Sequence, residues 1–117
     1  MAKSEENQVL ALYRTALALS EEMRSLARDS EWDALTAKET ARRELIEELR
    51  LIDTAAHTAT AFIDAKRGLI QGIMACDRET QELTRRWSAE LKEILDALNA
   101  KKNFRKPMMP IVRFQSG

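Results

Sequence analysis

The chain offers few side chains that could do chemistry. Its 117 residues contain one histidine, His57, and one cysteine, Cys76. A single cysteine excludes an internal disulfide and a zinc site built from cysteines. His57 has no second histidine or cysteine at a metal-ligand spacing, so we expect a solvent-facing or capping role for it. Cys76 lies on an apolar helix stripe, and we expect an inert core thiol because apolar surroundings disfavour the thiolate.

The acidic residues are numerous, but they form no catalytic pattern. Asp and Glu together number 19, as do Lys and Arg, so the formal net charge is zero. Many acids stand four residues from a base, as Glu82 does from both Arg78 and Arg86, which indicates a solvated helix face. The chain has neither a Gly-rich phosphate loop nor the Glu-x-x-His pattern of a di-iron bundle. We therefore expect no enzyme, no catalytic residue, no metal and no cofactor.

Composition also limits the compartment and the partners. A lone cysteine suits a reducing compartment, and no stretch approaches the roughly 18 apolar residues that span a bilayer. The segment 1–9 is polar and lacks the apolar centre of a signal peptide. We expect a cytoplasmic protein without a membrane span. The balanced charge gives no reason to expect direct contact with nucleic acid.

The distribution of glycine and proline predicts long helices. Neither residue occurs before Gly68, and both prolines lie in the last eleven residues. Apolar residues recur at spacings of three and four in three segments, at about 4–28, 30–53 and 60–102. We predict an all-α protein, an elongated antiparallel bundle of three long helices with a short, mostly irregular C-terminal tail.

Capping residues predict where the helices begin. Ser4 is expected at the N-cap of the first helix. Ser30 followed by Asp33 fits a capping box at the start of the second helix, with Asp in place of the usual Glu. The segment 54–60, rich in threonine and without an apolar period, is expected to connect the second and third helices.

The end of the chain differs in composition from the rest. From Lys101 onward there are five basic residues, no acid, and both prolines. The sequence thus predicts a helical bundle domain over 1–102 and a basic, proline-containing tail over 103–117. We expect the tail to be extended, mobile or docked rather than a fourth regular helix.

Two surfaces are candidates for partner binding. At 1.5 Å per residue the third helix is about 60 Å long and the first two about 35–38 Å, so the segment 86–100 should project unless a bend or the tail buries it. In the middle of the second helix alanines are the only apolar residues, so either a neighbouring helix approaches closely or a shallow groove is left open. The candidate residues are Trp87, Leu91, Ile94, Leu95 and Leu98 on the third helix, and Ala34, Ala37 and Ala41 on the second.

Two segments resemble the FliT family of flagellar export chaperones. The second helix reads EWDALTAKETARRELIEEL over 31–49, which resembles the family's Trp-Asp-x-Leu…Glu…x-x-Leu pattern. The stretch LIQGIMACDRETQELTRRWSAEL over 69–91 is similar to its Leu-Ile-x-x-Ile…Asp…Leu segment. The resemblance covers about residues 9–98, and the length and the helical layout agree with it.

The resemblance implies a small cytoplasmic chaperone. Members of the family bind the C-terminal helical segment of the filament-cap protein, prevent its premature assembly and deliver it to the flagellar type III export apparatus. They also contact the export ATPase complex and, in enteric bacteria, the master transcription activator of flagellar genes. An exposed apolar stripe or groove would suit such a client, since an amphipathic helix can lay its apolar face into it.

Two other functions stay open from the sequence. A structural coiled-coil module would pair the projecting part of the third helix with a second copy, as a homodimer without a client. A regulator of DNA-bound complexes would act through the basic tail, and its binding to duplex DNA would weaken steeply with salt. Mixing the chain with the client separates the first two functions, because a structural module ignores the client.

Overall fold

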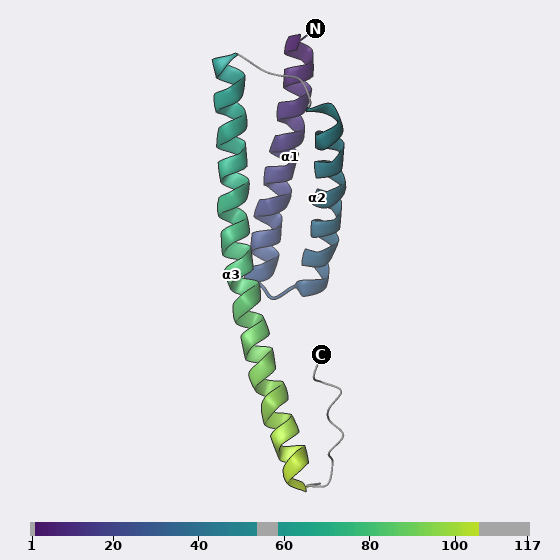
Figure 1. The fold of residues 1–117 in the computed structure, drawn as a ribbon, viewed down its shortest axis with the longest axis vertical. Helices are drawn as coiled ribbons and strands as arrows, with labels where there is room; N and C mark the ends of the chain where they lie inside the picture. Colours follow the sequence, from purple (N-terminus) through teal and green to yellow (C-terminus); the bar gives the residue numbers. More distant parts are fainter. Residues whose placement is uncertain (1, 54–58, 106–117) are drawn as a thin grey trace. The chain divides into compact units, whose positions relative to one another are not determined.

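The computed structural model describes residues 2–53 and 59–105, and the side chains of 5–53 and 59–101. These residues form three helices and no strand: α1 (Ala2–Arg28), α2 (Trp32–Ile52) and α3 (Thr60–Arg105) (Figure 1). The predicted all-α class is confirmed, and the helices lie close to the predicted segments. Residues 103–105, which the sequence assigned to the tail, belong to α3. His57 and the tail from residue 106 onward lie outside the described residues.

The chain divides into two compact units, Met1–Leu83 and Thr84–Gly117. The first unit contains α1, α2 and the part of α3 that ends at Leu83. Within this unit α2 runs antiparallel to α1 and α3, and α1 lies between the other two helices in the view of Figure 1. The described part of the second unit is the remainder of α3.

The core of the first unit is built around α1. Val9 and Leu10 of α1 form a buried cluster with Leu49 of α2 and Phe62 of α3. Because removing one such side chain from water is worth about 1.5–3 kcal/mol, this cluster holds one end of the three helices together. Along α2 only Leu49 is buried. Farther along α1 the buried residues are Ala16, Ser20, Met23 and Ala27.

The turn between α1 and α2 corrects the expected capping box. Ser30 has φ 59°, in the left-handed region. Its backbone N–H donates to the carbonyl of Ala27 at 3.2 Å, and that of Glu31 donates to the carbonyl of Leu26 at 2.8 Å. These two bonds are those of a Schellman motif, so Ser30 ends α1. The N-cap of α2 is Glu31, without a side-chain cap bond, and Ser4 lies inside α1 rather than at its N-cap.

The two glycines of α3 stand in different surroundings. A Cβ placed on Gly68 would have no atom within 4 Å, whereas one on Gly72 would lie 3.1 Å from Cδ1 of Leu17. Gly72 therefore marks a close approach of α3 to α1. Gly68 is exposed and has no such neighbour.

This difference predicts unequal effects of alanine at the two positions. Gly68→Ala should raise the free energy of unfolding by about 0.5–1 kcal/mol, because alanine loses less backbone entropy in a helix. Gly72→Ala should raise it by less, since the Leu17 side chain must shift to admit the new methyl group. Urea unfolding measures both variants, and equal gains would contradict the close approach of the two helices.

The burial of Cys76 agrees with the expected core position, because the residue is only 4% exposed. We predict slow modification of Cys76 by a thiol reagent in the native protein and fast modification in urea, since a buried thiol must wait for an opening of the structure. The reaction can be followed by absorbance of the released chromophore. Fast labelling without denaturant would show that α3 is open to water at this position.

Candidate functional site

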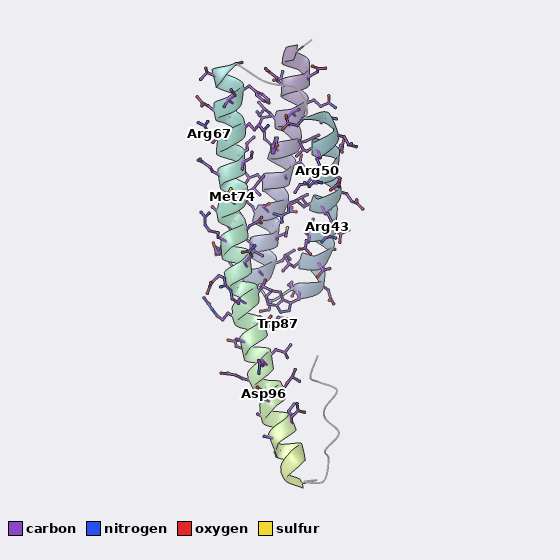
Figure 2. The ribbon with its side chains drawn as sticks, viewed as in Figure 1. Arg43, Arg50, Arg67, Met74, Trp87 and Asp96 are labelled. Carbon is purple, nitrogen blue, oxygen red and sulfur yellow. The ribbon has the colours of Figure 1, made fainter. Side chains whose placement is uncertain are left out.

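A cavity of about 390 Å³ opens between α2 and α3, with α1 as its floor. We call it the α2–α3 groove. Two of its apolar side chains face water, since Ile46 is 37% exposed and Met74 is 53% exposed. In Figure 2, Met74 extends from α3, and Arg43 and Arg50 extend from α2. The apolar lining consists of Ala16, Ile46, Leu49, Ile70, Ile73 and Met74.

A polar cluster closes one end of the groove. The Tyr13 hydroxyl donates a hydrogen bond of 3.0 Å to Oδ2 of Asp53, at the C-cap of α2. The same carboxylate forms an ion pair with Lys66 of α3, and its side chain is 8% exposed. The Lys66 ammonium also lies 5.6 Å from the centre of the Tyr13 ring. All three helices thus meet at this end through one carboxylate.

A second polar cluster lies at the other end, one turn beyond Ile46 and Ile73. Nη1 of Arg42 donates to Oδ1 of Asp77 on α3 at 2.6 Å and to Oγ of Ser20 on α1 at 2.7 Å. The Arg42 side chain is 15% exposed, and Ser20 is fully buried. Because the hydrogen bonds are charge-assisted and partly shielded from water, they are stronger than surface pairs.

The alanines predicted as a partner surface are placed on the outside of α2. Ala34, Ala37 and Ala41 are exposed. No described helix covers them, so the close approach considered from the sequence does not occur. The half-buried positions of this part of α2 include Lys38 and Arg42 instead. The role of the three alanines in partner binding stays a prediction.

The other predicted residues lie on α3 in the second unit. We call them the distal stripe: Trp87, Leu91, Ile94, Leu95 and Leu98. Trp87 and Leu91 are 37% exposed, and the other three are 49–58% exposed. They form an apolar row on one helix, and their role in partner binding stays a prediction. The sequence did not predict the α2–α3 groove.

The described residues contain no group of three or more His, Cys, Asp or Glu side chains that could hold a metal ion. Within the same residues no helix has an apolar run long enough to cross a bilayer.

The Arg42 cluster predicts different costs for two adjacent arginines. Arg42→Ala should lower the free energy of unfolding by about 1.5–3 kcal/mol, because it removes charge-assisted hydrogen bonds from Asp77 and the buried Ser20. Arg43→Ala is the matched control, since Arg43 is 66% exposed and stands 3.7 Å from Glu39 on its own helix. Its effect should stay below about 0.5 kcal/mol. Equal losses in chemical denaturation would mean that Arg42 does not join the helices.

Tyr13, the only tyrosine of the chain, should lose its proton at a higher pH than a free tyrosine does. Its pKa is raised from 10.0 to about 12 by burial, then by the hydrogen bond to Asp53 and by the negative charge of that carboxylate. Phenolate absorbance should report this pKa, and Asp53→Asn should bring it closer to 10. The unfolded chain loses the proton first, so this contribution to stability is complete below pH 10 and disappears as the pH rises from 10 to about 12. A pKa near 10 in the native protein would contradict the cluster.

Comparison with known proteins identifies the family. The family model described as Flagellar protein FliT matches residues 10–106. A search of curated proteins and a search of solved structures find no match. The matched range contains all of α2, all of α3 and every residue of the groove. This confirms the resemblance seen in the sequence: the chain belongs to the FliT family and is a flagellar export chaperone.

Proposed function

We propose that the chain is a cytoplasmic chaperone of the flagellar filament-cap protein. It binds an amphipathic C-terminal segment of this client in the α2–α3 groove, prevents premature assembly and delivers the client to the type III export apparatus. The observation that carries the proposal is an apolar groove left open between two helices of a packed bundle.

The shape and lining of the groove support a helical client. A helix that enters the groove would cover Ile46 and Met74 and become the fourth helix of the bundle. Apolar anchors at i, i+3, i+4 and i+7 of such a helix fall on one face and suit a groove between two helices. The polar clusters join the two walls at the ends of the groove, and Ile46 and Met74 between them stay exposed.

The distal stripe is a second proposed binding surface. Its five apolar residues are each at least 37% exposed, and with the exposed alanines of α2 this supports binding of partners other than the client helix. The proposed partners are the export ATPase complex, the master transcription activator of flagellar genes and a second copy of the chain. Binding of the activator would couple export to flagellar gene expression.

Two pairs of aspartate substitutions test where the client binds. Ile46→Asp with Met74→Asp should weaken binding of the cap protein's C-terminal segment by at least about tenfold, because a buried carboxylate without a partner is costly. Leu91→Asp with Ile94→Asp is the matched pair in the second unit and should leave this affinity unchanged. Isothermal titration calorimetry measures binding, and circular dichroism checks that each variant is folded.

If the groove variant binds the client as the wild type does, the client site lies elsewhere. Loss of binding in the distal-stripe variant alone would place the client on α3 of the second unit. A chain that ignores the client and only forms dimers by light scattering would support the structural module instead.

A further inference from the structure

We infer that the α2–α3 groove selects a short helix, about three turns long, that carries acidic residues beside its apolar face. This inference rests on the proposed function and adds the length and the charge of the segment that the groove accepts. Both properties follow from the charged side chains at the ends and along the edges of the groove.

The length follows from the two ion pairs that connect α2 with α3. Arg42–Asp77 stands at one end and Asp53–Lys66 at the other. Arg42 and Asp53 are eleven residues apart, and so are Lys66 and Asp77. Eleven residues of helix rise about 16 Å, which is three turns. A docked helix therefore has room for roughly three turns between the two ion pairs.

The acidic character expected of the docked helix follows from the basic residues beside the apolar walls. On α2, Arg43 and Arg50 lie three residues before and four residues after Ile46, so they share its side of the helix. On α3, Arg67 lies seven residues before Met74 and so shares its side of the helix. Both edges of the groove therefore carry arginine.

The acids close to these arginines do not cancel this charge within the groove. Asp53 and Asp77 each pair with a base of the opposite helix. Glu39 and Asp64 lie beyond the two ends, and Glu47 is one residue from Ile46 and so turned about 100° around the helix from it.

The pairs that these acids form on the outside are weak. Arg43–Glu39, Arg50–Glu47 and Arg67–Asp64 are 3.6–3.7 Å long, and all six side chains are more than half exposed. Such pairs are worth little in water, so the arginines can turn toward acids of a ligand at small cost.

The test uses the full chain and two synthetic peptides of about three turns, each held helical by a lactam bridge on the outer face. The peptides share leucines at i, i+3, i+4 and i+7 and differ only in the residues that flank them, which are glutamates in one and lysines in the other. Fluorescence anisotropy should show about tenfold tighter binding of the glutamate peptide, and this advantage should shrink as salt is added.

The second part of the test reverses the charge at the edge of the groove. Arg43→Glu with Arg50→Glu should abolish the preference for the glutamate peptide. The matched control is Arg14→Glu with Lys92→Glu, which makes the same change in net charge at exposed positions that do not line the groove and should keep the preference. A glutamate peptide extended by two further turns should bind no tighter than the short one.

The outcomes separate this inference from the proposed function. Equal affinity for the two peptides, or a preference lost in the control as much as in the groove variant, would overturn the acidic selectivity and leave the docking site intact. A clear gain for the extended peptide would overturn the length. If neither peptide binds, the groove is not a helix-docking site, and its assignment in the proposed function fails as well.

Discussion

Arg42 joins all three helices of the first unit, and the position of α2 depends on it. The helix buries a single residue, Leu49, near its C-terminal end. Along its first half it has no apolar residue in the core, and Arg42 reaches both Ser20 of α1 and Asp77 of α3. Along this half, α2 is therefore positioned by polar contacts rather than by buried apolar side chains. The Arg42 cluster and the Asp53 cluster thus join α2 to α1 and α3 at the two ends of the groove.

The helices could be predicted from the sequence because their causes are local. The absence of glycine and proline before Gly68 and the spacing of apolar residues decide where a chain can be helical. Ser30 was misread because a serine beside an acid suits a helix start, whereas the left-handed φ that makes it a helix end depends on how the turn packs. The sequence carries no direct signal for that angle.

The groove could not be predicted for a different reason. Its walls depend on the register between α2 and α3, which the pairs Arg42–Asp77 and Asp53–Lys66 define across at least twelve residues of sequence. Ile46 and Met74 look like ordinary members of a core stripe, and only the arrangement of three helices leaves them facing water. The distal stripe was easier to find, since helix length alone suggested exposed apolar residues beyond the reach of the shorter helices.

The uneven attachment of α2 also affects how the groove can respond to what enters it. Leu49 of α2 belongs to the same buried cluster as Val9, Leu10 and Phe62, and the half-buried Leu45 and Ile52 pack against that cluster. Segments with few buried apolar contacts lie at the low end of the local stability scale. The first half of α2, which has no buried apolar residue, is therefore expected to open more readily than the half that lines the groove.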